Sequence, residues 1–286
     1  MASLEEPAIR NVSDTALWVA LYRAQESERP DALFHDPYAR RLAGERGARI
    51  AAEETFASRN LWSFTARTVL LDRIIEQQIA SGADMVINLA AGLDTRPYRL
   101  PLPPQLRWVE VDLAPMLEYK ASILREAEPH CQLQRQATDL ADPAARQALF
   151  ARLGDQARRV LVITEGLLIY FMPATVAALA RDLATPASFQ AWALDFGSPG
   201  LLRMMNRKMG TAVAQAGTPF RFAPAEGTKF FQPCGWHATE VHTLLRAALG
   251  HHRLSWPLTL AAWLPQSHPG KGNRPWSAVC LLERTR

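Results

Sequence analysis

Residues 85–100 read MVINLAAGLDTRPYRL, and this stretch decides the fold. Residues 85–89 form a short apolar run with β-branched side chains, which is typical of a buried strand. Residues 90–92, Ala-Ala-Gly, follow directly, and such small residues let a ligand approach the backbone closely. In open α/β sheets, ligands bind at the carboxyl ends of the strands. The stretch therefore predicts a first strand that ends at a ligand-binding turn.

Strands and helices alternate after this first strand. We expect strands at residues 107–111, 131–136, 160–163 and 189–194, and helices at 114–126, at 143–153 and from about 173. Asp142 before Pro143 is a favourable N-cap and first turn for the second of these helices. The alternation implies right-handed crossovers and a mostly parallel sheet with helices on both faces.

The chain before the first strand reads as helical. Apolar residues recur at helical spacing in residues 15–26 and 60–80, and Ser81-Gly82 is expected to end the second of these helices. We therefore expect residues 1–82 to form an N-terminal helical cap and residues 83–286 to form the α/β domain.

The alternation breaks after the fifth strand. Residues 197–235 are rich in Met, Gly, Pro and Arg, and we expect them to form a substrate lid inserted into the domain. The C-terminal segment is expected to form a helix at 238–249 and strands at 258–263 and 277–282.

The composition is that of an ordinary globular protein. Of 286 residues, 48% are apolar and 21% are charged, and the net charge is +4. No basic patch interleaved with aromatic residues favours a nucleic-acid partner, and no apolar run is long enough to span a membrane. We therefore expect a small-molecule acceptor as partner and neither a nucleic acid nor a membrane. The N-terminus does not resemble a signal peptide, so we expect a cytoplasmic protein. The three cysteines are far apart, and His237 and His242 do not share a helical face, so we expect no metal site.

An acidic residue follows each of the four later strands: Asp112, Asp139, Glu165 and Asp195. Since the carboxyl ends of parallel strands meet at one edge of a sheet, these acids would repel one another unless a ligand or cation uses them. Asp112 stands about twenty residues after the first turn, where a carboxylate accepts hydrogen bonds from ribose hydroxyls. This position favours a ligand-binding role for Asp112.

Several motifs in order make the sequence recognisable. NLAAGLDTRPYRL, WVEVDL, TDLAD and ITEGLLIYF, preceded by TALWVALYRAQESERPDALFHDPYAR and ARTVLLDR, closely resemble the leucine carboxyl methyltransferase family and its bacterial relatives. Those relatives are S-adenosylmethionine-dependent O-methyltransferases, some of which act on polyketides. The resemblance covers about residues 13–195 and, more weakly, the C-terminus. It implies a class I methyltransferase-like, Rossmann-like fold with S-adenosyl-L-methionine as cofactor.

The resemblance also implies which residues bind the methionine half of the cofactor. Arg67 is placed like the arginine that pairs with the cofactor's carboxylate, a task suited to the planar guanidinium. Ala90 and Gly92 match the turn beneath the methionine part, although the family usually has glycine where this chain has Ala90. Glu165 matches an acid near the cofactor's amino group and the methyl donor.

The nucleoside half of the cofactor is assigned in the same way. Asp112, with Leu113 beside it, matches the acid that binds the ribose. Asp139 and Leu140 match the pair that contacts adenine, where the carboxylate accepts from the amino group and the leucine packs on the ring.

Asp94 and Arg99 look like the family's D-T-x-x-x-R signature. A buried ion pair that holds the loop explains these two residues as well as ligand contact does.

The sequence restricts the acceptor less than the cofactor. Methyl transfer from a sulfonium mainly requires in-line positioning and exclusion of water. A carboxylate acceptor needs no base, whereas a phenol benefits from one. The candidate bases are His237, which we expect at the start of a helix, Tyr170 and Asp195, and spacing singles out none of them. The aromatic residues that we consider for an apolar acceptor pocket are Tyr22, Tyr38, Tyr170, Phe220, Phe222 and Trp236.

Our first hypothesis is an O-methyltransferase that acts on a carboxylate or hydroxyl of a small, natural-product-like acceptor. The second is a protein C-terminal carboxyl methyltransferase. A nicotinamide-dependent oxidoreductase would require G-x-G-x-x-G at the first turn and a second mononucleotide-binding half, and the sequence has neither. A non-catalytic module that keeps only the fold is disfavoured because the matches at Arg67, Asp112, Asp139 and Glu165 are intact.

Overall fold

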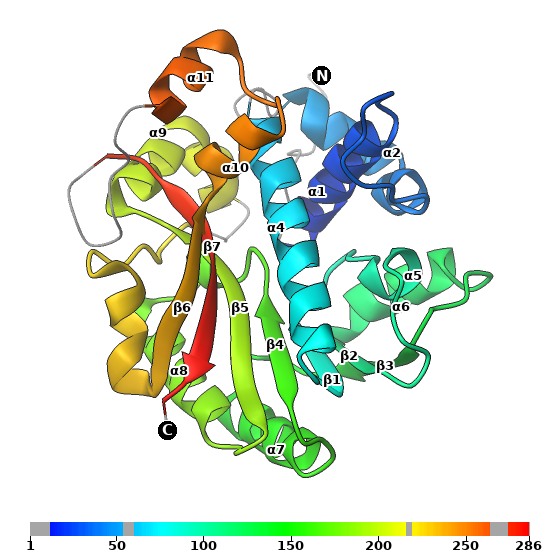
Figure 1. The fold of residues 1–286 in the computed structure, drawn as a ribbon. Helices are drawn as coiled ribbons and strands as arrows, with labels where there is room; N and C mark the ends of the chain where they lie inside the picture. Colours follow the sequence, from blue (N-terminus) through cyan, green and yellow to red (C-terminus); the bar gives the residue numbers. More distant parts are fainter. Residues whose placement is uncertain (1–11, 54–59, 216–218, 264–273, 286) are drawn as a thin grey trace, which may run out of the picture.

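A computed structural model describes residues 12–53, 60–215, 219–263 and 274–285, and its centre is a seven-stranded sheet (Figure 1). The strand order is β3-β2-β1-β4-β5-β7-β6. Strands β1 to β5 run parallel to one another, and β7 runs antiparallel to both β5 and β6. The strands are β1 (Met85–Leu89), β2 (Arg107–Asp112), β3 (Gln132–Ala137), β4 (Val160–Thr164), β5 (Phe189–Gly197), β6 (Trp236–Thr243) and β7 (Ser277–Arg284). The predicted mostly parallel α/β sheet is confirmed.

The helices lie around this sheet (Figure 1). They are α1 (Val12–Ser27), α2 (Ala39–Glu53), α4 (Leu61–Ala80), α5 (Arg96–Arg99), α6 (Ala114–Ile123), η1 (Leu168–Tyr170), α7 (Pro143–Gly154), α8 (Pro173–Ala184), α9 (Pro199–Gln215), η2 (Gly227–Cys234), α10 (Leu244–Gly250) and α11 (Trp256–Trp263). The predicted cap of α7 is confirmed, because the Asp142 carboxylate accepts hydrogen bonds from the backbone N–H groups of Ala144 and Ala145.

Two hydrophobic cores cover the two faces of the sheet. On one face, Leu71 and Ile75 of α4 pack in the same core as Val86 of β1 and Leu161 of β4. On the other face, α7, α8 and η2 pack against the sheet, with Phe231 of η2 fully buried. Strands β1 and β4 are buried along their whole length, as their continuous apolar runs indicate.

A third core lies beyond the carboxyl end of β1 and contains Trp18 of α1, Leu42 of α2, and Leu93 and Tyr98 from the turn after the strand. Helix α4 packs on both sides: Leu71 and Ile75 lie in the sheet core, and Phe64 contacts Trp18 and Tyr22 of α1. The division of the chain into residues 1–82 and 83–286 stays a prediction.

The helix predicted at residues 238–249 is wrong over its first half. Residues 236–243 form edge strand β6, which pairs with β7, and only residues 244–250 are helical. Thr239, Val241 and Thr243 are β-branched and favour a strand.

The strand predicted at residues 258–263 is also wrong, because these residues belong to helix α11. Leucine and alanine are good helix formers, and Pro257 is well tolerated in the first turn. Both edges of β7 are already paired, so the sheet offers no place beside it for a further strand.

Candidate active site

A cavity of about 840 Å³ lies at the carboxyl ends of β1, β2, β4 and β5. Each of these strands contributes to its wall: Ala90 and Gly92 follow β1, Asp112 ends β2, Glu165 follows β4, and Asp195 lies near the end of β5. The sheet thus brings these sequence-predicted residues to one edge.

The turn after β1 has an unusual backbone. Gly92 has φ 46°, and a Cβ atom there would meet the Cβ of Ala16 on α1 at 3.4 Å. Ala90 also has a positive φ, 51°, which an L-residue adopts only at a cost of about 1–2 kcal/mol. Residue 90 therefore has a backbone conformation that glycine, the usual residue of the family, would adopt freely, and the alanine in this chain adopts it under strain.

Asp112 is bound to the same turn. Its Oδ2 accepts the backbone N–H of Gly92 at 2.7 Å, and its Oδ1 accepts that of Leu113 at 2.7 Å. Burial raises the pKa of Asp112, and these two N–H groups offset only part of that increase. Carboxylate oxygens have further lone pairs, so Asp112 remains able to accept hydrogen bonds from a ligand in the cavity.

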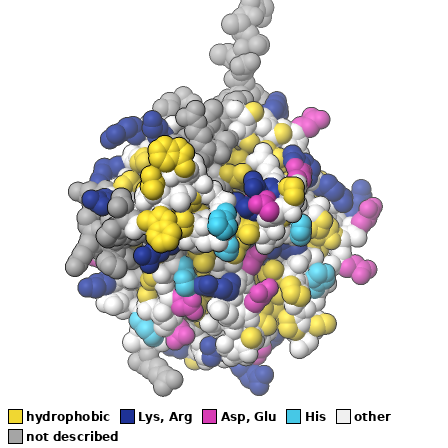
Figure 2. Space-filling model, turned by 45° about the horizontal axis from the view of Figure 1, so that its top comes forward, with side chains coloured by type: hydrophobic (Ala, Val, Ile, Leu, Met, Phe, Trp, Pro, Cys, Tyr) yellow, Lys and Arg dark blue, Asp and Glu magenta, His cyan; other side chains and the backbone are white. Residues whose placement is uncertain are grey.

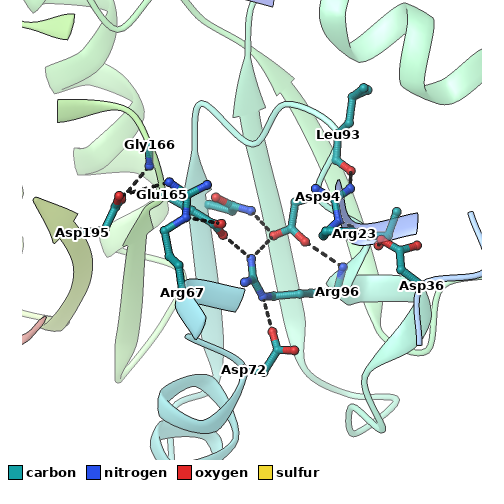
Figure 3. A network of polar contacts seen from close by, with 12 residues as sticks. Arg23, Asp36, Arg67, Asp72, Leu93, Asp94, Arg96, Glu165, Gly166 and Asp195 are labelled. Atoms are coloured by element: carbon teal, nitrogen blue, oxygen red, sulfur yellow. Dashed lines mark hydrogen bonds and ion pairs between the residues drawn. The ribbon is translucent and has the colours of Figure 1, made fainter. Parts of the chain in front are cut away.

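Arg67 of α4 lies between two carboxylates on the cavity wall (Figure 3). Its Nε donates to Glu165 Oε1 at 2.9 Å, and its Nη1 donates to Asp195 Oδ2 at 3.2 Å. The other oxygen of Asp195 accepts the backbone N–H of Gly166 at 2.6 Å. A helix and two strand ends are therefore joined through one guanidinium.

A second arginine extends these ion pairs (Figure 3). Arg96 is 2% exposed, and its Nη1 donates to Glu165 Oε2 at 2.8 Å and to Asp94 Oδ2 at 2.7 Å. Its Nε donates to Asp72 Oδ1 at 2.6 Å, and Arg99 donates two hydrogen bonds to the same carboxylate of Asp72. We call these seven residues, Arg67, Asp72, Asp94, Arg96, Arg99, Glu165 and Asp195, the charge network.

The D-T-x-x-x-R signature had two explanations, a buried ion pair and contact with the ligand. The charge network supports a different one for Arg99 than for Asp94. Arg99 pairs with Asp72 and does not line the cavity, so it holds the loop. Asp94 pairs with Arg96 and also lines the cavity.

Burial and ion pairing compete in setting the pKa values of these carboxyl groups. Burial alone would raise the pKa of Glu165, but the guanidinium groups of Arg96 and Arg67 outweigh it and hold that pKa below its usual value. The pKa of Asp94 is lowered in the same way, chiefly by Arg96. Asp195 differs, because its burial outweighs Arg67 and the Gly166 N–H and raises its pKa.

A separate ion pair anchors the N-terminal helix to the turn after β1. Arg23 of α1 donates through Nε to Asp36 Oδ2 at 2.8 Å and through Nη2 to the carbonyl oxygen of Leu93 at 2.6 Å. Thr95 donates its hydroxyl to the same Asp36 oxygen at 2.6 Å. Helix α1 is thus fixed above the cavity, where Thr15, Ala16 and Val19 form part of its wall.

Six of the eight predicted cofactor residues line the cavity: Arg67, Ala90, Gly92, Asp112, Leu113 and Glu165. The two residues matched to adenine do not. Asp139 is exposed and accepts the backbone N–H of Ala141 at 2.9 Å, and Leu140 is buried in the hydrophobic core. The loop that carries them touches the end of β2, since the N–H of Thr138 donates to the carbonyl oxygen of Asp112. The adenine contact stays a prediction.

His237 is wrong as a candidate base. It is exposed on β6 and pairs in register with Glu283, at the end of the sheet opposite the cavity. The error follows from the helix expected there. Tyr170 and Asp195 both line the cavity and remain candidates.

Two of the six aromatic residues considered for the acceptor pocket, Tyr170 and Phe220, line the cavity. Phe222 and Trp236 are wrong: both are buried in the sheet core, where the Trp236 indole N–H donates to the carbonyl oxygen of Ala180. Tyr22 and Tyr38 pack in the third core, beyond the carboxyl end of β1, and do not line the cavity.

Sequence reasoning missed the central role of Arg96 and its partner Asp72. One signal was available for Asp72: it is a carboxylate within the apolar run of α4, beside the fully buried Leu71. A charged residue in such a run is rarely buried without a partner.

The residues of this cavity fit S-adenosyl-L-methionine. The small-residue turn allows close approach, Asp112 offers a hydrogen-bond acceptor for hydroxyl groups, and the exposed side chain of Leu113 offers apolar surface beside it. Arg67, Glu165 and Asp195 present both signs of charge, which suits a ligand with a carboxylate, an ammonium and a sulfonium.

Comparisons with known proteins agree with this fit. The leucine carboxyl methyltransferase family matches residues 16–184. A protein of Streptomyces coelicolor, named a candidate S-adenosyl-L-methionine-dependent methyltransferase, is 35% identical over 270 residues, which are 90% of this chain and 92% of the relative. A Streptomyces avermitilis protein of the same description is 34% identical over 281 residues, 94% of this chain and 95% of the relative.

Solved structures show the same fold. A candidate methyltransferase of Thermobifida fusca has a TM-score of 0.60 at 15% identity and covers 98% of this chain and 96% of its own. A DUF574 family protein of Streptomyces avermitilis has a TM-score of 0.58 at 16% identity, with 93% and 97% covered.

Fold, site and relatives together define an S-adenosyl-L-methionine-dependent methyltransferase with a Rossmann-like fold. The chain belongs to the leucine carboxyl methyltransferase family. Among the described residues, no helix is long and apolar enough to cross a membrane, and no cluster of His, Cys, Asp and Glu is arranged to hold a metal ion.

The strained Ala90 generates a stability prediction. We expect Ala90→Gly to raise the free energy of unfolding by up to about 1 kcal/mol, because relief of the positive φ exceeds the entropy that glycine adds to the unfolded chain. The matched control is Ala91→Gly, at a buried position without positive φ, which we expect to lower the same free energy by roughly 0.5–1 kcal/mol. Urea unfolding measures both, and equal losses in the two variants would contradict the strain at Ala90.

The lowered pKa of Glu165 predicts how stability depends on pH. A carboxyl group whose pKa is lower in the folded state stabilises the fold above its unfolded pKa, about 4.3, and loses this effect as pH falls through the folded value. We expect Glu165→Gln to flatten the loss of unfolding free energy between about pH 5 and pH 3. Glu118→Gln, at an exposed position on α6, is the control and should leave the slope unchanged. The assignment fails if both variants keep the wild-type slope.

Proposed function

We propose that the protein transfers a methyl group from S-adenosyl-L-methionine to an oxygen atom, carboxylate or hydroxyl, of a small, largely apolar acceptor of natural-product type in the cytoplasm. The observation that carries this proposal is the composition of the cavity wall. Charged groups gather mainly at the strand ends, and most of the remaining wall is apolar, with Arg23 and Arg274 as further charged residues.

The charged part of the wall would hold the cofactor. Asp112 accepts hydrogen bonds from the ribose hydroxyls, and Arg67 and Glu165 offer opposite charges to the carboxylate and the ammonium of the methionine part. Arg67 is already oriented by Glu165 and Asp195, so little side-chain entropy is lost when a ligand arrives. When bound, S-adenosyl-L-methionine supplies a methyl carbon activated by its positive sulfonium.

The apolar part of the wall would hold the acceptor. It includes side chains from several helices, from the residue after η1 and from the segment before β7, among them Val19, Phe64, Ile169, Phe171, Met204, Leu258 and Trp276. Such a wall excludes water from the reacting atoms and orients an apolar acceptor by burying its surface. In-line positioning is the main requirement of a methyl transfer.

The expected cap and lid contribute to this wall in part. Helix α1 from residues 1–82 and helix α9 from residues 197–235 both line the cavity. By contrast, η2 in the second segment packs into the sheet core. We therefore assign the acceptor-shaping role to α1 and α9.

Neither of the two remaining candidate bases is well suited to take a proton, and this favours a carboxylate acceptor, which needs no base. Burial raises the pKa of Tyr170, so its hydroxyl stays protonated and can donate a hydrogen bond but not take a proton. Asp195 has a raised pKa yet is engaged by Arg67 and Gly166. An acceptor that is already ionised makes neither group necessary as a base.

A second candidate function is the carboxyl methylation of a protein or peptide C-terminus. The family's name, leucine carboxyl methyltransferase, supports it. A peptide that ends in leucine therefore belongs in every acceptor screen.

Cofactor binding tests the role of Asp112. We expect Asp112→Asn to weaken the affinity for S-adenosyl-L-methionine by roughly 10- to 100-fold, because a hydrogen bond to a charged group contributes about 1.5–3 kcal/mol. Titration calorimetry measures this change, with NAD as the control ligand and Asp155→Asn, at an exposed position, as the control variant. Unchanged affinity in Asp112→Asn would remove Asp112 from the site.

An acceptor screen tests the proposed reaction. We expect formation of S-adenosyl-L-homocysteine with apolar carboxylic acids, with kcat/KM falling roughly fourfold for each methylene removed, since burial of one CH₂ contributes about 0.8 kcal/mol. Mild alkali hydrolyses a methyl ester but not a methyl ether, and so identifies the methylated group. Turnover of the leucine peptide alone would favour the second candidate, and methylation of nitrogen or carbon would contradict both.

A further inference from the structure

Helix α11 is apolar on both of its sides. Leu258 and Ala261 line the cavity, whereas Trp256, Leu260 and Trp263 are 76%, 59% and 75% exposed. A helix that is hydrophobic all round is normally buried, and an exposed group of large apolar side chains marks an interaction surface.

The chain around α11 is strongly basic. Residues 197–282 contain nine Lys or Arg and only two Asp or Glu, whereas the rest of the chain has more acidic than basic residues. On α9, Leu201 and Met204 line the cavity, and Arg207 and Lys208 are exposed. Figure 2 shows hydrophobic side chains flanked by basic ones on this side of the molecule, where Figure 1 places α9 and α11 close together. Helix α11 thus lies near a helix that carries two exposed basic side chains.

We propose that α11 inserts the side chains of Trp256, Leu260 and Trp263 into the surface of an anionic lipid bilayer, while Arg207 and Lys208 of α9 contact the headgroups. Tryptophan concentrates at the boundary between headgroups and acyl chains. Exposed apolar side chains combined with nearby basic ones are the features that bind proteins to anionic membrane surfaces.

The polarity of α11 favours a bilayer over a protein partner. Thr259 is the only residue of the helix with a hydroxyl group, and it donates that hydroxyl to the backbone carbonyl oxygen of Ser255. A protein interface typically contains a hydrogen bond for every 100–200 Å². Apart from the two indole N–H groups, the exposed side of α11 offers no side-chain donor for such an interface. The acyl region of a bilayer requires none.

Helix α11 also forms part of the cavity wall, so contact with a membrane would connect the lipid surface to the cavity. An apolar acceptor would pass from the lipid surface along α11 into the cavity without crossing water. This last step rests on the proposed function, whereas binding to the bilayer does not.

Cosedimentation with sucrose-loaded vesicles tests the proposal on the full chain, without cofactor or acceptor. We expect binding to vesicles of phosphatidylcholine mixed with phosphatidylglycerol, and weak binding to pure phosphatidylcholine. Trp256→Ala/Trp263→Ala should lower the partition coefficient at least about tenfold. Arg207→Gln/Lys208→Gln should lower binding to the anionic vesicles by roughly 30-fold and reduce its salt dependence, because each of the two basic residues near the surface contributes about 1 kcal/mol.

Two control variants test whether loss of any exposed apolar or basic side chain, away from α11 and α9, lowers vesicle binding. Met172→Ala removes an apolar side chain that is 51% exposed at the start of α8, and Arg158→Gln removes an exposed charge before β4. Both variants should bind anionic vesicles like the wild type. A thermal shift with S-adenosyl-L-methionine in every variant shows that the fold is intact.

Two results would overturn the proposal. One is wild-type protein that binds neither kind of vesicle, or tryptophan variants that bind as well as the wild type. The other is a wild-type dimer that the two tryptophan substitutions convert to a monomer, since a second copy of the chain would then cover α11. Because the assay contains no acceptor, its failure is distinct from failure of the acceptor screen.

Discussion

The buried ion pairs of Glu165 with Arg67 and Arg96 are the constraint on which the site depends. Arg67 comes from α4, Arg96 from the turn after β1, and Glu165 from the end of β4, so one carboxylate fixes three elements at the ligand edge of the sheet. Removal of charges from water is costly, and such a network persists only when its hydrogen bonds are nearly complete. Asp72 and Asp94 accept further hydrogen bonds from Arg96, so the loop after β1 is tied to α4 as well as to β4.

The parallel half of the sheet could be predicted because its signals are local. Each strand from β1 to β5 is a short run between turns, and the buried β1 and β4 are continuously apolar. The C-terminal part could not be predicted in the same way. Residues 236–243 form a strand that pairs with β7, whereas residues 256–263 form a helix and pair with no strand. These decisions depend on tertiary pairing, which a window of sequence does not contain.

The site residues likewise fall into those whose position the sequence predicts and those whose partners only the structure shows. The position of Asp112 follows from topology, because a carboxylate at the end of the second strand of such a sheet must lie beside the first turn. The partners of Glu165 do not follow from local sequence: Arg96 is 69 residues away and Arg67 is 98 residues away. Resemblance supplied Arg67 and Glu165 as separate ligand-binding residues, and only the structure shows that they also bind each other. His237 failed because its assignment depended on the mistaken helix.

The charge network contains four carboxylates and three guanidinium groups, so it holds one excess negative charge when all are ionised. Asp72 and Arg99 do not line the cavity and pair with each other behind its wall. The five other members line the cavity and comprise three carboxylates and two guanidinium groups, so the excess negative charge of the network faces the ligand. A cofactor with one net positive charge, such as S-adenosyl-L-methionine, would therefore be favoured there over its demethylated product, which lacks the charge of the sulfonium.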